Sequence, residues 1–261
     1  MNGSGKGRAT RSLRAALASG GFAAGVMLYE FDTPAVMRLL ALAGVDFAIF
    51  DLEHTGWDAG TLRRLFATGR GTDVDPIVRV QRADRSLVAS ALDAGARGVM
   101  APMIETVAAA ELLVDAARYP PQGRRGFGVL LSDDLHGGPA AAVARANETT
   151  FVIAQIETRA GIEHADEIAA VDGVDLIWLG QFDLTLSLGV PGDFTHPDYT
   201  AAVEHLLVAC RSAGKPIGQM IRSVEEGRAL RRMGFGAAAY ADVWVFEDAL
   251  RAQLDALRGE R

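Results

Sequence analysis

The fold is indicated most directly by one stretch of the chain, AGVDFAIFDLEH at residues 43–54. Gly44 stands where a helix would end, because glycine tolerates the left-handed conformation that is common just after a helix. The apolar run that follows it has the length and composition of a buried strand. Two carboxylates and a histidine (Asp51, Glu53 and His54) come where that strand would end. The stretch predicts a strand that delivers proton-handling groups to one edge of a sheet, and the alternative is a solvated loop.

The same alternation of strand-like and helix-like segments runs through the whole chain. Strands are expected at residues 23–28, 47–52, 77–80, 98–102, 151–157, 176–180, 216–221 and 237–240. Amphipathic helices are expected at residues 34–43, 59–69, 86–94, 107–117, 162–170, 199–213, 224–233 and 247–258. Eight such units in 261 residues predict an α/β fold, a single (β/α)8 TIM barrel. A doubly wound open sheet is the alternative, but residues 180–183 (GQFD) are not the Gly-rich phosphate-binding fingerprint typical of it.

Local signals mark the helix ends and the limits of the domain. Glycine stands at the end of four predicted helices: Gly44, Gly95, Gly214 and Gly234. Ser223, with Glu226 three residues further on, predicts a capping box for the helix after the seventh strand. Residues 1–12 are polar and basic, so we expect a flexible tail there and a catalytic barrel domain over residues 13–261.

Composition limits the possible partners and compartment. The formal net charge of −7 argues against a nucleic-acid-binding surface, which would normally be basic, but leaves room for a locally positive site that binds an anionic small molecule. The single cysteine, Cys210, excludes an intrachain disulfide, fits a reducing cytoplasm and is expected to pack within the apolar helix at 201–210. No run approaches the roughly 20 apolar residues that span a bilayer, so no membrane association is expected.

Polar side chains gather at the predicted carboxyl ends of several strands. Arg79 ends the third strand, Gln155 and Glu157 share one face of the fifth because they are two residues apart, and Asp183 follows the sixth. Carboxylates on neighbouring strands suit a hard divalent cation such as Mg²⁺ or Mn²⁺. The alternatives are that Glu157 pairs with an arginine, that Asp183 caps the next helix, and that Arg79 forms a structural ion pair.

A long connection at residues 119–147 interrupts the alternation. Such a loop in a compact domain is usually functional or disordered. Because it falls between the fourth and fifth strands, we expect it to lie over the carboxyl-terminal mouth of the barrel, where active sites sit. Asp93 lies earlier, among apolar residues of the helix at 86–94, and the alternative to a functional role for it is a hydrogen bond to the adjoining turn.

Six motifs together resemble the HpcH/HpaI aldolase family, the metal-dependent class II pyruvate aldolases. In chain order they are FDLEHT at 50–55, VR at 78–79, LDAGA at 92–96, RYPP at 118–121 with RGFG at 125–128, QIET at 155–158 and GQFDL at 180–184. Each motif is weak alone, but six in the family's order make a specific resemblance, which covers roughly residues 22–257. It implies a (β/α)8 barrel that assembles as a hexamer, with the last helix exchanged between subunits.

The resemblance also implies which residues bind the metal and the substrate. Glu157 and Asp183 are the implied ligands of a divalent cation (Mg²⁺, Mn²⁺ or Co²⁺). Gln155, Gly180 and Phe182, with the backbone amides near Phe182, are similar to the part of the family's site that holds pyruvate. The chain departs from the family pattern beside them, because Gln181 stands where members often have proline and Phe182 is bulkier than the residue in several relatives.

The catalytic roles are implied in the same way. Arg79 is expected to bind the substrate and to stabilise an enolate. His54 is expected to be the catalytic base, with Asp51 and Asp93 as its supporting carboxylates. Glu53 has no assigned role at this point: it either faces the water shell of the metal or pairs with an arginine of the long loop.

The activity implied by the resemblance is reversible cleavage of a 4-hydroxy-2-oxo acid into pyruvate, or a close analogue, and an aldehyde, through a metal-stabilised enolate. Two alternatives are a related carbon–carbon lyase acting on an acyl-CoA thioester and a non-catalytic metabolite-binding barrel. The first would need a basic surface for the nucleotide, and the sequence offers only Arg124 and Arg125. The intact set of catalytic and metal-binding residues argues against the second.

Lysine usage bears on the mechanism independently of any family. Only Lys6 and Lys215 occur, and Lys6 falls in the expected tail. Lys215 precedes the seventh strand, at the end of the barrel opposite to the expected site. Because the other aldolase chemistry needs a lysine that forms a Schiff base with the substrate, the sequence argues against it.

Overall fold

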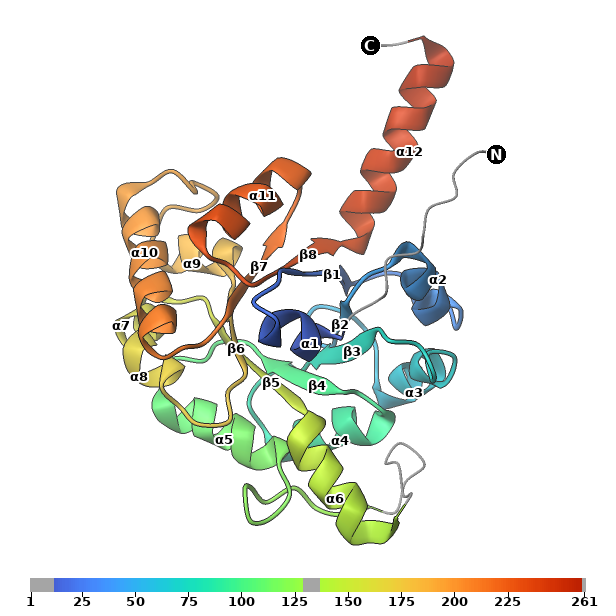
Figure 1. Cartoon of the computed structure of the whole chain (residues 1–261). Helices are drawn as coiled ribbons and strands as arrows, with labels where there is room; N and C mark the ends of the chain where they lie inside the picture. The colour runs from blue at the N-terminus through green and yellow to red at the C-terminus, as the bar shows by residue number, and fades with distance from the viewer. Residues whose placement is uncertain (1–11, 129–136, 260–261) are drawn as a thin grey trace.

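The computed structural model describes residues 12–128 and 137–259 of the chain. Across these residues, eight parallel strands close into a barrel in chain order, with the eighth paired back to the first (Figure 1). They are β1 (Ala23–Leu28), β2 (Phe47–Asp51), β3 (Asp75–Arg79), β4 (Gly98–Ala101), β5 (Phe151–Ile156), β6 (Leu176–Leu179), β7 (Ile217–Ile221) and β8 (Ala237–Ala241). The predicted (β/α)8 barrel is confirmed, and each predicted strand begins and ends within two residues of the bounds of an observed strand.

Helices surround the strands. They are α1 (Leu13–Ala18), α2 (Val36–Ala43), α3 (Ala59–Ala67), α4 (Arg85–Ala94), α5 (Val107–Ala117), α6 (Gly138–Thr149), α7 (Arg159–Glu163), α8 (Ala165–Ala169), α9 (Gln181–Ser187), α10 (Pro197–Ser212), α11 (Val224–Met233) and α12 (Asp242–Arg258). The sequence did not indicate α1, α6 or α9, and the helix expected at 162–170 is divided into α7 and α8.

The predicted helix-end signals are largely confirmed. The four glycines expected after helices have positive φ angles: Gly44 (78°), Gly95 (114°), Gly214 (66°) and Gly234 (102°). Ser223 caps α11, because its Oγ accepts a hydrogen bond from the Glu226 backbone N–H at 3.1 Å. The Glu226 carboxylate accepts from the backbone N–H of Arg222 instead of that of Ser223, so the capping box is displaced by one residue on that side.

The core has two parts, because alternate residues of each strand face opposite sides. Inside the barrel, the rings of Phe47 and Trp178 meet edge to face with centroids 6.3 Å apart. Outside it, Phe50 packs under the helices, with its ring 4.9 Å from that of Phe66 on α3. Every residue of β2 is buried, as expected for a parallel strand covered on both faces.

The amino-terminal end of the barrel is covered by α1. The backbone N–H of Leu13 donates to Asp75 Oδ2 at 2.8 Å, which ties this helix to the first residue of β3. Residues 1–11 of the expected tail lie outside the described residues, and its last residue, Ser12, caps α1 by accepting from the Ala15 N–H. Lys6 likewise lies outside the described residues.

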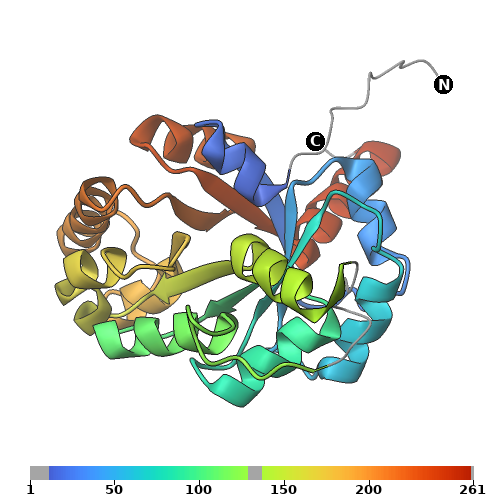
Figure 2. The ribbon, with the colours of Figure 1, turned by 60° about the horizontal axis from the view of Figure 1, so that its bottom comes forward.

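The long connection lies at the amino-terminal end of the barrel, so the expectation that it covers the carboxyl-terminal mouth is wrong. Arg118, just after α5, donates through Nη1 to the carbonyl of Thr150, the residue before β5, at 2.7 Å. The connection follows a helix and precedes a strand, so it joins the two at the end where strands begin. Figure 2 brings its helix α6 (yellow-green) toward the viewer. Residues 129–136 lie outside the described residues.

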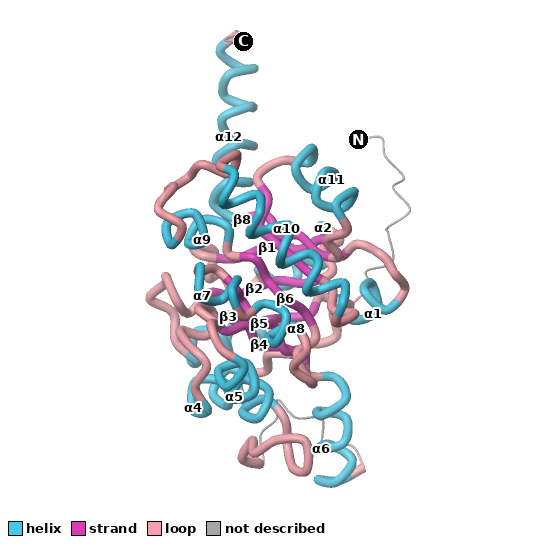
Figure 3. Tube along the Cα trace, turned by 90° about the vertical axis from the view of Figure 1, so that its left-hand side faces the viewer, coloured by secondary structure: helices cyan, strands magenta, loops and turns pink. Residues whose placement is uncertain are grey.

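Helix α12 contacts the barrel at its start and is not held against it along its length. It begins five residues earlier than expected, at Asp242, packs at its start against β1 and β8, and projects away from the barrel (Figure 3). Apolar side chains are exposed along it: Val245, Phe246, Leu250, Leu254 and Leu257. No helix within the described ranges is both long and apolar enough to cross a membrane.

Cys210 has the packing role expected from the sequence. Its side chain is buried in α10, and burial raises the pKa of the thiol to about 12. A thiol that stays protonated is a poor nucleophile.

Candidate active site

A buried ion pair joins the ends of β2 and β3. Asp51 and Arg79 are the last residues of these strands and lie opposite each other in the register. Arg79 Nε donates to Asp51 Oδ1 at 2.7 Å, and the two side chains are 7% and 0% exposed. Burial would lower the pKa of Arg79, but the hydrogen bond and charge of Asp51 raise it overall, so the guanidinium stays charged.

Asp51 also shapes the loop that carries His54. Its carboxylate accepts the backbone N–H groups of Glu53 and His54, each at 3.0 Å. Asp51 thus orients Arg79 and the loop backbone, whereas the sequence had suggested that it would support the imidazole. One carboxylate can do both because its two oxygens can accept several hydrogen bonds at once.

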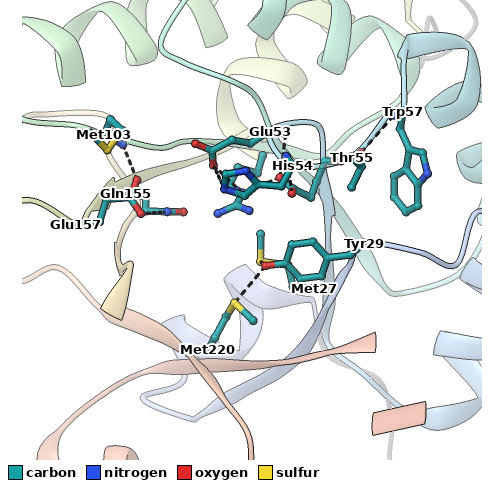
Figure 4. A network of polar contacts seen from close by, with 12 residues as sticks. Met27, Tyr29, Glu53, His54, Thr55, Trp57, Met103, Gln155, Glu157 and Met220 are labelled. Atoms are coloured by element: carbon teal, nitrogen blue, oxygen red, sulfur yellow. Dashed lines mark hydrogen bonds and ion pairs between the residues drawn. The ribbon is translucent and has the colours of Figure 1, made fainter. Parts of the chain in front are cut away.

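The carboxylate beside the imidazole is that of Glu53. Glu53 Oε2 lies 3.6 Å from His54 Nε2 and 3.2 Å from Arg79 Nε (Figure 4). Burial raises the pKa of Glu53, with Arg79 opposing and Asp51 and Asp183 adding to the rise. The His54 side chain is 60% exposed, so its ring is accessible from the mouth.

Tyr29, directly after β1, is a member of the site that sequence reasoning missed. Its ring centroid lies 6.0 Å from Arg79 Cζ, a cation–π distance. Its hydroxyl contacts the sulfur atoms of Met27 and Met220 at 3.2 and 3.4 Å (Figure 4). Burial raises the pKa of Tyr29 to about 12. The available signal was position, since Tyr29 comes at the carboxyl end of a predicted strand, as Glu53 and Glu157 do.

Glu157 is a buried carboxylate held by two neutral donors. It is 2% exposed, its Oε1 accepts the Met103 backbone N–H at 2.8 Å, and its Oε2 accepts from Gln155 Nε2. Met103 donates from a left-handed backbone conformation (φ 54°), which is uncommon outside glycine and recurs at functional sites. Burial raises the pKa of Glu157 to about 7, and the nearby charges of Asp183 and Glu53 add to the rise. No arginine pairs with Glu157 among the described residues.

Gly180 provides the space for that carboxylate. A Cβ atom at this position would stand 2.2 Å from Glu157 Oε2 and 3.1 Å from Gln155 Nε2. Gly180 is also the N-cap residue that precedes α9, and Asp183, in the first turn, makes no capping hydrogen bond among the described residues. The capping alternative for Asp183 is therefore not observed. Phe182 is 45% exposed and meets Phe194 and Trp244 edge to face at 5.4 and 6.0 Å.

The residues of the mouth fit a divalent cation of the Mg²⁺ type. Within the described ranges, no group of three or more His, Cys, Asp or Glu side chains is arranged to hold a metal. Mg²⁺ commonly uses only one or two protein carboxylates and fills its other positions with water and substrate. Gln155 Oε1 and Arg79 Nη2 are buried and have no hydrogen-bond partner among the described residues. Polar atoms left open in this way are the expected complement of a charged ligand.

Asp93 is not part of this arrangement within one chain. It lies near the carboxyl end of α4, at the end of the barrel opposite to His54, and its Oδ1 accepts from Arg125 Nη2 at 2.8 Å. A cavity of about 670 Å³ lies at the same opposite end, lined by Asp75, Arg97 and Thr150, among others, and none of the strand-end residues above lines it.

Lys215 has the place expected for it. It precedes β7, at the end of the barrel where strands begin, and its Nζ donates to the Val174 carbonyl at 2.7 Å. An amine tied to the backbone at that end cannot reach a substrate at the mouth.

This arrangement on a (β/α)8 barrel defines a carbon–carbon lyase of the aldolase type. The chain belongs to the HpcH/HpaI aldolase/citrate lyase family, whose sequence profile matches residues 26–242. It is 36% identical to a hydroxypyruvate/pyruvate aldolase of Roseovarius nubinhibens, over 87% of this chain and 88% of the relative. It is 34% identical to a 5-keto-4-deoxy-D-glucarate aldolase of Escherichia coli K12, over 87% and 89% of the two chains. The crystal structure of an HpcH/HpaI aldolase from Desulfitobacterium hafniense matches with a TM-score of 0.88 and 28% identity, over 95% and 97% of the two chains.

We expect Gly180→Ala to displace the Glu157 carboxylate, because the new Cβ would overlap Oε2. Losing a group that orients a ligand typically costs about 10- to 100-fold in metal affinity. Calorimetric titration with Mn²⁺ measures the effect. Gly56→Ala is the matched control, since a Cβ there meets nothing within 4 Å. Unchanged Mn²⁺ affinity in Gly180→Ala would show that Glu157 does not hold the cation.

We expect Glu157→Gln to stabilise the metal-free protein in a pH-dependent way. The folded pKa of about 7 lies above the ordinary value of 4.5, so between these values the folded chain keeps a proton that the unfolded chain releases. The free energy of unfolding of the wild type therefore falls as pH rises through this window, by about 3 kcal/mol at most. The variant lacks this decline, so its advantage should grow from pH 4.5 to 7 in urea titrations with chelator. Glu111→Gln, on the exposed face of α5, serves as control, and an advantage independent of pH would contradict the assignment.

Proposed function

We propose that the chain is a divalent-metal-dependent aldolase that reversibly cleaves a 4-hydroxy-2-oxo acid into pyruvate, or a close analogue, and an aldehyde. The observation that carries the proposal is the pairing of a buried, unneutralised carboxylate, Glu157, with a buried arginine, Arg79, at one mouth. The Glu157 carboxylate suits a cation, and the Arg79 guanidinium suits the substrate anion that this cation would bind. The relatives support the same chemistry, since two of them are named as aldolases of 2-oxo acids.

In this proposal, Glu157 and Asp183 hold the cation, which is Mg²⁺, Mn²⁺ or Co²⁺ and supplies Lewis-acid stabilisation of the enolate. Gln155 and the turn at Gly180 bind the 2-oxo acid beside it. The open Nη2 of Arg79 adds a fixed positive charge aimed at the oxygen where negative charge develops.

The proton of the 4-hydroxyl group goes to His54 Nε2 when the C3–C4 bond breaks. Glu53 is placed to stabilise the imidazolium that results, because its Oε2 lies 3.6 Å from that nitrogen. In the synthetic direction the same nitrogen returns the proton to the new alkoxide. Asp51 acts indirectly, by holding both the His54 loop and Arg79.

The aldehyde has room beside Asp183. A cavity of about 570 Å³ opens there, lined by Met103, Thr158, Arg159, Leu186 and Ser187, among others. The residues that line the cavity lie after β4 and in or next to α7 and α9, and we expect them to determine which aldehyde binds.

The activity is tested by incubating the purified chain with pyruvate and a panel of aldehydes, with Mn²⁺ and after exhaustive chelation. We expect carbon–carbon bond formation that chelator abolishes and Mn²⁺ restores. His54→Ala should lower kcat by about 100-fold or more, the usual contribution of a general base. His205→Ala, on the surface of α10, should match the wild type. Full turnover after metal removal would contradict the proposed mechanism, and full turnover of His54→Ala would contradict the assigned base.

We further propose that the chain assembles as a hexamer through exchange of α12. A helix with Phe246, Leu250 and Leu257 exposed has an apolar face that a second copy of the chain would cover. Leu39 and Leu42, exposed on α2, offer matching apolar surface on the barrel.

We expect Leu250→Asp to lower the mass of the assembly, because a charge would then be buried in the contact. Light scattering after size exclusion measures the mass, and six chains are expected for the wild type. Ala252→Asp is the matched control, because it adds the same charge at an exposed position that lies about half a helical turn from Leu250, on the other side of α12. A Leu250→Asp protein that keeps the wild-type mass would contradict the role of α12.

A further inference from the structure

The carboxylate of Asp242, the first residue of α12, is saturated by backbone donors. Its Oδ2 accepts the N–H groups of Tyr29, Glu30 and Phe31 at 3.1, 3.0 and 3.1 Å. Its Oδ1 accepts the Val243 N–H at 2.7 Å, and the residue is 4% exposed. No arginine or lysine pairs with it among the described residues. Charge-assisted bonds of this kind are among the stronger ones, so Asp242 fixes the loop after β1.

The fixed loop carries the ring that faces Arg79. Tyr29 lies 6.0 Å from Arg79 Cζ, and its hydroxyl is held between two methionine sulfur atoms. Asp51 and Glu53 contact Arg79 through Nε, whereas Nη2 is left open. The carboxylates of Asp51 and Glu53 orient the guanidinium at Nε, and the Tyr29 ring is a second contact that orients its plane. The direction of the open Nη2 therefore depends on Tyr29 as well.

The same loop contacts α12 a second time. Phe31 meets Phe246 edge to face, with centroids 5.6 Å apart. Three consecutive residues of the loop, 29–31, thus contact the first two turns of a helix that projects away from the barrel. A change in the direction of α12 would act on the loop through both contacts.

We propose that Asp242 is a positioning residue that places Tyr29 against Arg79, so that the seating of α12 sets the geometry of the arginine at the active site. The inference rests on the proposed function for the role of Arg79. It assigns to the beginning of α12 a part in catalysis that is separate from its part in assembly. Glu157, just after β5, is held by Met103 and Gln155 and takes no part in this route, and α12 approaches the metal-binding half of the site through the ring contact of Trp244 with Phe182.

The test compares Asp242→Asn, Asp242→Glu, Tyr29→Leu and the double variant Asp242→Asn/Tyr29→Leu. Asp248→Asn is the matched control, because it removes a carboxylate from the same helix that makes only a distant, exposed contact with Arg222. Measured for each are kcat and KM in the aldol reaction, the Mn²⁺ dissociation constant, and amide hydrogen exchange of the peptide that contains residues 29–31.

Both Asp242 variants should exchange these amides faster and lose about 10- to 100-fold in kcat, the scale of a small misplacement of a catalytic group. Their Mn²⁺ dissociation constants should stay within about twofold of the wild type, which general loss of structure would not allow. Because Asp242 acts through Tyr29, the double variant should be no slower than the slower single variant.

Multiplicative losses in the double variant, or faster exchange with unchanged kcat, would overturn the inference. A parallel loss of Mn²⁺ affinity would overturn it as well. A wild-type chain without metal-dependent aldol activity would contradict the proposed function instead. In that case, amide exchange still tests the structural part of the inference: if residues 29–31 exchange as slowly in Asp242→Asn as in the wild type, Asp242 does not fix the loop.

Discussion

A buried ion pair between Asp51 and Arg79 holds the active end of the barrel together. The closed parallel sheet places these two residues opposite each other at the last position of neighbouring strands. Since both are almost fully buried, removal of Arg79 would leave Asp51 as an uncompensated buried charge, at a cost of about 3–5 kcal/mol. The remaining acceptor sites of Asp51 bind the loop that carries His54. The direction of Arg79 and the position of the His54 loop therefore both depend on one carboxylate.

The other half of the site is built on a different principle. Glu157 has no positive partner among the described residues and is held by an amide and a backbone N–H. Its burial needs glycine at 180, because any larger residue would occupy the same space. Gln181 donates to the Met220 carbonyl and so ties the start of α9 to β7.

Much of this could be predicted because barrel closure turns sequence position into spatial position. An apolar run followed by polar residues is sufficient to bring Asp51, Arg79 and Glu157 to one mouth. The same rule does not extend to the long connection, which follows a helix and precedes a strand and so belongs to the opposite end of the barrel. Two helices were not predicted from the sequence. Helix α6 is rich in small residues and has no clear apolar face, and helix α9 is only seven residues long.

The contacts among the strand-end residues were harder to predict. The position of a residue along its strand gives the face on which its side chain lies. Which other side chain it contacts depends on the directions of side chains from several strands. Nothing in the pattern distinguishes Asp51 from Glu53 as the neighbour of the imidazole. In the same way, the pairing of Tyr29 with Arg79 depends on Asp242, which is more than 200 residues away in the chain.

The balance of charge shows why the two halves need each other. The residues assigned to the site carry four carboxylates (Asp51, Glu53, Glu157 and Asp183) and one guanidinium. A 2-oxo acid anion would be repelled by that excess, at about 4 kcal/mol for each pair of like charges 4 Å apart in a medium of effective dielectric constant 20. A divalent cation beside Glu157 would offset two of these charges and favour the ionised form of a carboxylate whose pKa burial has raised to about 7. Cation and substrate are then complementary: the cation makes the site attractive to the anion, and Arg79 binds the part of the anion that the cation leaves exposed.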